Sequence, residues 1–349
     1  MHKTLLNLFL KSCADNRKSK IQNRKWGGMV AIGVAFAMCG AVAEAQQAGK
    51  VPRIGILPLG PISERVHVWE AFRQGLRELG YVEGQNITLV FPSGEVKPER
   101  LPHLAAELVS LKVDVIVAAA TVAVQAAKEA TKTIPIVMPI ASDPVGTGLV
   151  ASLARPGGNV TGLTTIASDL SGKRLELLKE VVPRLSRVGV LSNPTSANVP
   201  PQMREIEVTA RALAVQLQRL EVRGPDDIDR VFQAATKERA GALITLDDAF
   251  VFTQRTRIVK LAAKSRLPAI YGFREFVEDG GLMSYAANLV DMYRRAATYV
   301  DKILKGAKPA DLPVEQPTKF EFIISLKAAK QIGLTIPPNV LVRADKVIR

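Results

Sequence analysis

The chain has 349 residues, with 47 Lys and Arg against 33 Asp and Glu, and a formal net charge of +14. Its 47% apolar content indicates a globular protein rather than a disordered or low-complexity one, and the length predicts two domains of about 100–200 residues. The two cysteines and three histidines are not expected to supply a zinc site, which needs about four clustered ligands.

Residues 1–45 are typical of an export leader. A basic stretch at 17–25 precedes an uncharged run at 26–42, which ends at the small-x-small cleavage site 43–45. The run is shorter than the roughly 20 apolar residues of a membrane span, which disfavours an anchor. We therefore expect cleavage near Ala45 and an exported chain without cysteine, with 40 basic and 31 acidic residues and a net charge of +9. These charges are dispersed and lack interleaved aromatics, so nucleic acid is not an expected partner.

In the first half, short apolar runs alternate with longer amphipathic runs. The strand-like runs lie at 53–59, 87–91, 113–118 and 134–140. The helix-like runs lie at 70–79, 98–111 and 123–130. Nearly all-apolar, β-branched strands separated by helices are typical of a parallel sheet that is covered on both faces. This half is therefore predicted to have an α/β fold.

The second half repeats this order. The run at 187–191 resembles 53–57 at an offset of 134 residues, and 267–270 resembles 134–137 at an offset of 133. The other predicted strands lie at 241–246, 281–286 and 320–324, and the predicted helices at 205–220, 290–305 and 326–332. The sequence therefore predicts an α/β protein of two doubly wound parallel-sheet lobes.

Motifs for phosphate or acyl chemistry are missing. No G-x-x-x-x-G-K-[ST] and no G-x-S-x-G occurs. The run 146–151 has the form G-x-G-x-x-A, but it follows the fourth strand of its lobe instead of opening the fold, which favours a turn and helix start over a dinucleotide site. The chain is therefore expected to be a binder and not an enzyme, with no cofactor and no metal.

Several longer strings resemble one known family. They lie at 70–86, 142–162, 171–179, 267–271, 280–285 and 296–306. The family is that of ABC transporter substrate-binding proteins related to tryptophan- and tyrosine-binding proteins, with a type I periplasmic-binding-protein fold. The resemblance extends from about Arg53 to the C-terminus and implies two lobes that close on a ligand by hinge motion.

The resemblance also implies lobe boundaries. The first lobe would comprise 51–164 and 282–312, and the second 165–281 and 313–349. The chain would cross between them near 164–168, 279–282 and 313–317.

In such sheets a ligand lies outside the carboxyl ends of the strands, so the residues that follow the strands are candidate ligand contacts. The candidates are Ser63, Thr121, Ser142, Asp143, Asn193, Asp247 and Tyr271.

A zwitterionic ligand would use these candidates in different ways. The hydroxyls of Thr121 and Ser142, with N–H groups at a helix N-terminus, suit a carboxylate. Asp143 or Asp247 suits an ammonium group, and Tyr271 suits an apolar or aromatic portion.

Each role has a structural alternative. Asp143 and Asn193 both precede proline and could start turns. Asp247 or Asp248 could be a helix N-cap, and Tyr271 could belong to the core.

The predicted function is that of a periplasmic solute-binding component of an ABC importer. It would capture a small polar organic solute, with an amino acid as the candidate, and deliver it as a monomer to a permease in the inner membrane. One alternative is an exported module that senses a ligand for a membrane receptor. Another is a nucleotide-dependent oxidoreductase that uses 146–151.

Overall fold

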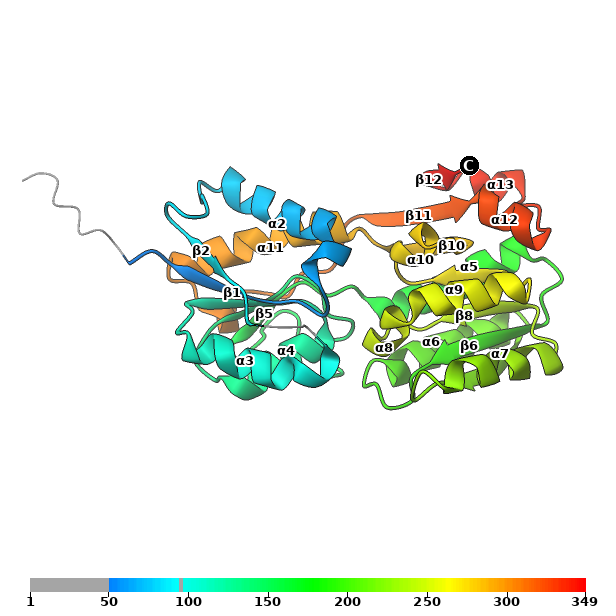
Figure 1. The fold of residues 1–349 in the computed structure, drawn as a ribbon, viewed down its shortest axis with the longest axis horizontal. Coiled ribbons are helices and arrows are strands. Elements are labelled where there is room, and N and C mark those ends of the chain that lie inside the picture. The colour runs from blue at the N-terminus through cyan, green and yellow to red at the C-terminus, as the bar shows by residue number, and fades with distance from the viewer. Residues whose placement is uncertain (1–49, 94–96) are drawn as a thin grey trace, which may run out of the picture. The chain divides into compact units, whose positions relative to one another are not determined.

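The computed structural model describes residues 50–93 and 97–349, so the predicted leader and its cleavage near Ala45 lie outside the described residues. Val51–Arg349 forms one compact unit that contains two sheets (Figure 1). None of the helices in these described residues has the length and apolar character of a membrane span.

The first sheet has five parallel strands in the order β2-β1-β3-β4-β5. Their bounds are β1 Arg53–Leu57, β2 Thr88–Val90, β3 Val115–Ala118, β4 Ile136–Met138 and β5 Val160–Gly162. The first four lie within or next to the predicted strand runs. The sequence analysis did not include β5, because a strand of three residues carries almost no periodic signal.

Helices cover both faces of the first sheet (Figure 1). α2 (Val66–Glu78) and α11 (Leu289–Leu304) pack on one face, where the rings of Trp69 and Tyr293 meet edge to face with centroids 5.0 Å apart. α3 (Leu101–Ser110) and α4 (Thr121–Ala130) cover the other face. The 3-10 helices in the described residues are η1 Ile62–Glu64, η2 Pro98–Arg100 and η3 Pro309–Asp311.

The second sheet has seven strands in the order β12-β11-β10-β9-β8-β6-β7. Their bounds are β6 Arg187–Ser192, β7 Gln216–Glu221, β8 Ala242–Thr245, β9 Ala269–Tyr271, β10 Met283–Ala287, β11 Phe320–Ser325 and β12 Lys346–Ile348. Neighbouring strands are parallel except for β10 and β11, which are antiparallel.

Helices also cover both faces of the second sheet. The apolar core on one face includes residues of α5 (Ala167–Val181), α6 (Val199–Ala212), α12 (Leu326–Ile332) and α13 (Pro338–Leu341). The core on the other face includes residues of α7 (Asp227–Lys237), α8 (Ala249–Thr253), α9 (Arg255–Lys264) and α10 (Glu275–Glu278). The predicted α/β fold with two parallel-sheet lobes is confirmed.

The helix predicted over 205–220 is wrong at its C-terminal end. α6 ends at Ala212, Ala214 adopts a φ of 52°, and residues 216–221 form β7. β7 is the edge strand of its sheet, and only two of its six residues are buried. Its polar composition therefore resembles an amphipathic helix more than a buried parallel strand.

The strand β10 lies in the second sheet, whereas the sequence analysis assigns 282–312 to the first lobe. β10 pairs with β9 on one edge and with β11 on the other, which satisfies its backbone groups within that sheet. The chain reaches the helices of the first sheet at Asn288, whose Oδ1 accepts a hydrogen bond of 3.0 Å from Asp291 N at the start of α11. This crossing therefore follows β10 instead of preceding it at 279–282.

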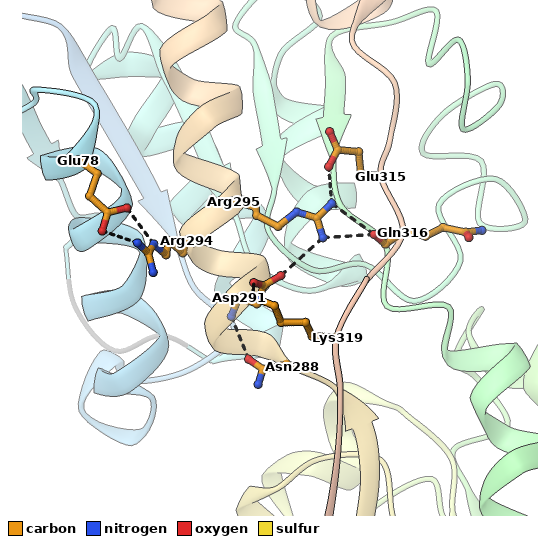
Figure 2. A network of polar contacts seen from close by, with 8 residues as sticks. All are labelled: Glu78, Asn288, Asp291, Arg294, Arg295, Glu315, Gln316 and Lys319. Carbon is orange, nitrogen blue, oxygen red and sulfur yellow. Dashed lines mark hydrogen bonds and ion pairs between the residues drawn. The ribbon is translucent and has the colours of Figure 1, made fainter. Parts of the chain in front are cut away.

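The segments that link the two sheets lie side by side (Figure 2). Leu163 forms a parallel bridge with Glu315, and Thr164 N donates to Glu315 O at 3.0 Å. Asn288 N donates to Lys319 O at 2.9 Å. Each linking segment is therefore hydrogen-bonded to another one.

Ion pairs join the first turns of α11 to one of these segments (Figure 2). Arg295 pairs with Glu315, and Lys319 Nζ donates to Asp291 Oδ1 at 2.5 Å. All four side chains come from α11 or from the segment between η3 and β11. The start of α11 is thus held where the chain passes between the sheets.

Close packing of α2 on α11 depends on Gly75, and we predict that Gly75→Ala destabilises the protein. A Cβ at this position would lie 2.5 Å from Arg294 O and 2.8 Å from Ala297 Cβ. Overpacking of this kind costs about 1–3 kcal/mol. Gly158→Ala is the control, because its added Cβ would meet no atom within 4 Å. Urea denaturation of both variants checks this, and an equal loss in both would contradict it.

Candidate functional site

A cavity of about 460 Å³ lies at the carboxyl ends of strands from both sheets, and we call it the inner cavity. Its apolar lining residues are Leu59, Ala120, Val122, Ile140, Ala141, Ala249, Phe252 and Phe273. Its polar lining residues are Arg65, Thr121, Ser142, Thr165, Asn198, Asp247 and Asp248. A mostly apolar cavity with a few convergent polar groups is the usual form of a small-molecule site.

The N-terminus of α4 forms one polar wall of the inner cavity. Ala120 precedes the helix with a φ of 90°, a strained conformation for a non-glycine residue, and no side chain caps the helix there. Thr121 Oγ1 accepts a hydrogen bond of 3.2 Å from Ser142 N, which joins the loops after β3 and β4. The predicted residues Thr121 and Ser142 therefore lie together beside an uncapped helix N-terminus, which favours an anion.

Asp247 lines the same cavity, but its charge is already paired. Its two carboxylate oxygens each accept a hydrogen bond of 3.0 Å from Arg174, and both side chains are almost completely buried. Burial raises the pKa of the Asp247 carboxyl above its ordinary value, and the Arg174 guanidinium opposes that rise. Asp247 is therefore bound within the protein, which makes it a poor acceptor for a ligand ammonium group.

The neighbouring Asp248 is the N-cap of α8, because its Oδ1 accepts a hydrogen bond of 3.0 Å from Val251 N. It also lines the inner cavity and is buried. Within the described part of the chain, Asp248 forms no ion pair. A carboxylate has about four lone-pair sites, so the cap leaves Asp248 able to accept further hydrogen bonds.

Asp143 and Tyr271 both make contacts that stabilise the fold. Asp143 Oδ1 accepts a hydrogen bond of 2.8 Å from Gly146 N, and its carbonyl accepts one of 3.0 Å from Thr147 N, so it organises a turn. Tyr271 is fully buried and stacks on Phe276 with ring centroids 4.5 Å apart. Burial raises the pKa of its phenol. Both residues match the structural alternatives to ligand contact.

Ser63 and Asn193 are not among the lining residues of the inner cavity. Ser63 is exposed in η1. Asn193 lines a wider cavity of about 1810 Å³, which shares Thr121, Asn198 and other residues with the inner one. Asn193 Oδ1 accepts hydrogen bonds from the Thr195 N–H and hydroxyl groups, at 3.1 and 2.8 Å.

Arg65, in the loop after β1, was not among the predicted site residues. Its Nε lies 2.9 Å from Glu275 Oε1, and its guanidinium lies 4.0 Å from the centroid of the Phe252 ring and 5.3 Å from that of Phe273. Burial raises the pKa of Tyr293 to about 12, and the nearby Arg65 opposes this rise. The one signal that could have identified Arg65 as a site residue is that it lies close to Ser63 in the sequence.

Asn198 was also missed, although it follows the candidate Asn193 in the loop after β6. Its backbone carbonyl accepts a hydrogen bond of 2.9 Å from Gln202, whereas its buried Oδ1 has no hydrogen-bond partner among the described residues. Gln202 also bonds both backbone groups of Asp247, at 2.8 and 3.0 Å. A buried acceptor without a partner is costly, so this oxygen is a candidate ligand contact.

A metal site has no support in the part of the chain that the structure describes. No group of three or more His, Cys, Asp or Glu side chains there is arranged to hold a metal ion.

We predict that Arg174→Met lowers the free energy of unfolding by about 3–5 kcal/mol, because it leaves the buried Asp247 carboxylate without its partner. Lys173→Met is the control, since the Lys173–Glu176 pair is exposed and such pairs contribute about 0–1 kcal/mol. Denaturant titration measures both. Equal stability of the two variants would contradict this account of the buried pair.

Comparison with known proteins identifies relatives over most of the chain. A tyrosine-binding protein of Clostridioides difficile (strain R20291) is 27% identical over 265 residues, which cover 76% of each protein. The crystal structure of a conserved domain protein from Vibrio cholerae is 30% identical, with a TM-score of 0.80 over 85% of this chain and 100% of that one. The structure of an ABC domain in complex with L-Trp from Streptococcus pneumonia is 28% identical, with a TM-score of 0.79 over 85% of this chain and 99% of that one.

The predicted type I periplasmic-binding-protein fold is confirmed, because more distant solute-binding proteins share it. Residues 63–348 match the sequence pattern of the family described as ABC transporter substrate binding protein. The chain therefore belongs to the ABC transporter substrate binding protein family.

Proposed function

We propose that this protein is the solute-binding component of an ABC importer, and that it captures an amino acid in the inner cavity and delivers it to a permease in the inner membrane. The leader-like composition of residues 1–45 supports export to the periplasm, where the protein would act as a monomer. The names of two relatives, a tyrosine-binding protein and a domain in complex with L-Trp, support an aromatic amino acid.

The single observation that carries this proposal is the placement of two opposite polar poles in one apolar cavity. The first pole is the uncapped N-terminus of α4 with the hydroxyls of Thr121 and Ser142, which suits the α-carboxylate of the ligand. The second pole consists of Asp248 and of Asn198 Oδ1, which has no hydrogen-bond partner in the described part of the chain. Both suit the α-ammonium group.

The first pole belongs to the first sheet and the second pole to the second sheet. α4 follows β3, whereas Asn198 and Asp248 follow β6 and β8. A zwitterion held by both poles would therefore contact both lobes at once. Such a ligand favours the arrangement in which the two poles are close, which is the basis of hinge closure around a solute.

The apolar lining between the poles suits the ligand side chain. Phe252 and Phe273 meet edge to face with ring centroids 5.3 Å apart, and Leu59 and Ile140 line the same cavity. Aromatic rings prefer edge-to-face or offset neighbours, so this lining favours an aromatic or large apolar side chain.

Binding of an amino acid is tested by a thermal-shift screen of the purified protein against the common L-amino acids, followed by calorimetric titration. We expect L-tyrosine, L-tryptophan or L-phenylalanine to raise the melting temperature, because a ligand at 100 times its Kd stabilises the native state by about 2.7 kcal/mol. A well-folded sample that none of the amino acids stabilises would refute the proposed function.

The role of Asp248 is tested by Asp248→Asn. Asparagine is also a good N-cap, so α8 is retained while the charge that faces the ammonium group is lost. We expect affinity for the amino acid to fall about tenfold to hundredfold, because a hydrogen bond to a charged group contributes about 1.5–3 kcal/mol. Asp143→Asn is the control, because Asp143 organises a turn, and calorimetry should give it nearly wild-type affinity. An equal effect of the two substitutions would exclude Asp248 as the ammonium acceptor.

A further inference from the structure

Arg65 has buried donor atoms that form no hydrogen bond within the described part of the chain. The residue is 9% exposed and lines the inner cavity. Its Nη2 and Nε have no hydrogen-bond partner among the described residues, although Nε lies 2.9 Å from Glu275 Oε1. A buried N–H group without a partner costs free energy, so the cavity at this point favours a ligand atom that accepts a hydrogen bond.

The charge of Arg65 is already balanced, which limits the kind of acceptor. The guanidinium is paired with the buried Glu275 carboxylate and lies over the ring of Phe252. A second carboxylate at this position would add an unpaired negative charge to a buried site. A neutral oxygen, such as a phenol, carbonyl or alcohol oxygen, accepts from Nη2 without this cost.

The order of the strands places Arg65 next to the strand that precedes Thr121 and two strands away from the one that precedes Ser142. Arg65 follows β1 and Ser142 follows β4, and β3 lies between these strands. Strands are about 4.8 Å apart, so β1 and β4 are separated by roughly 10 Å. In the second sheet, Glu275 follows β9 and Asn198 follows β6, with β8 between them. The ion pair of Arg65 with Glu275 therefore lies at one end of the cavity, and Ser142 and Asn198 follow strands toward the other end.

We propose that Arg65 determines ligand specificity by donating a hydrogen bond from Nη2 to an oxygen at the far end of the ligand side chain. The site then prefers L-tyrosine over L-phenylalanine and L-tryptophan. The phenol oxygen of tyrosine accepts this hydrogen bond, whereas phenylalanine has no acceptor and the indole N–H of tryptophan is only a donor. This inference rests on the proposed function, since it assumes that an amino acid occupies the inner cavity.

The proposal is tested by calorimetric titration of the wild-type protein with L-tyrosine, L-phenylalanine and L-tryptophan. We expect tyrosine to bind about tenfold to hundredfold more tightly than phenylalanine, the range for a hydrogen bond to a charged group. Arg65→Met combined with Glu275→Gln removes the donor and also the carboxylate that would lose its partner. In this double variant we expect tyrosine and phenylalanine to bind with nearly equal affinity, and the affinity for phenylalanine to stay close to the wild-type value.

Arg255→Met is the matched control. Arg255 also lies over Phe252, at 4.7 Å from the ring centroid, and its Nη2 is paired with Glu64 at 2.9 Å. This variant removes a cation from the same ring and should keep the preference for tyrosine. Thermal melts of all variants confirm that each is folded.

Three results would overturn the proposal. Equal binding of tyrosine and phenylalanine by the wild-type protein would show that Arg65 does not select the side chain. An equal loss of affinity for all three amino acids in the double variant would show that Arg65 holds the α-carboxylate or supports the cavity as a whole. If none of the three binds the wild-type protein, the proposed function fails, and the inference fails with it.

Discussion

The buried ion pair between Arg174 and Asp247 determines which polar groups of the second lobe are left to act in the inner cavity. Arg174 lies on α5 and Asp247 at the end of β8, so the pair ties a helix to the loop that lines the cavity. Gln202 then bonds the backbone of Asp247 and the carbonyl of Asn198. Because Asp247 is neutralised in this way, Asp248 is the carboxylate left to act in the cavity.

Some polar groups around the inner cavity are paired within the protein, and others are not. Thr121 and Ser142 join two loops by a hydrogen bond, and Glu275 balances the charge of Arg65. Asn198 Oδ1 and Arg65 Nη2 have no hydrogen-bond partner among the described residues, and both residues line the cavity. Buried polar atoms normally have partners, so these two atoms are candidate ligand contacts.

Much of the fold could be predicted from the sequence, because buried parallel strands such as β3 and β8 are continuous apolar runs with a strong signal. The signal fails at strands that are short or lie at an edge. β5 has three residues, and β7 has few buried ones, so neither carries the pattern. The position of β10 also depends on pairing with β11, more than 30 residues further along the chain, which local periodicity does not encode.

The candidate site could also be predicted only in part, because contacts between residues far apart in the sequence leave no local pattern. The rule that ligands lie at strand ends placed Thr121, Ser142 and Asp247 on the inner cavity. It could not identify Asp247 as the partner of Arg174, since that contact joins residues 73 positions apart. It also missed Arg65, whose position depends on Glu275 of the other lobe.

The packing of α11 on α2 has a consequence for how the chain acquires its structure. Glu78 and Arg294 form an ion pair between these helices although they are 216 residues apart in sequence. The core of the first lobe therefore lacks one of its covering helices until nearly the whole polypeptide has been synthesised. Contacts between such distant residues slow folding. A newly made chain would thus remain unfolded for longer, as the proposed export through a translocation pore would require.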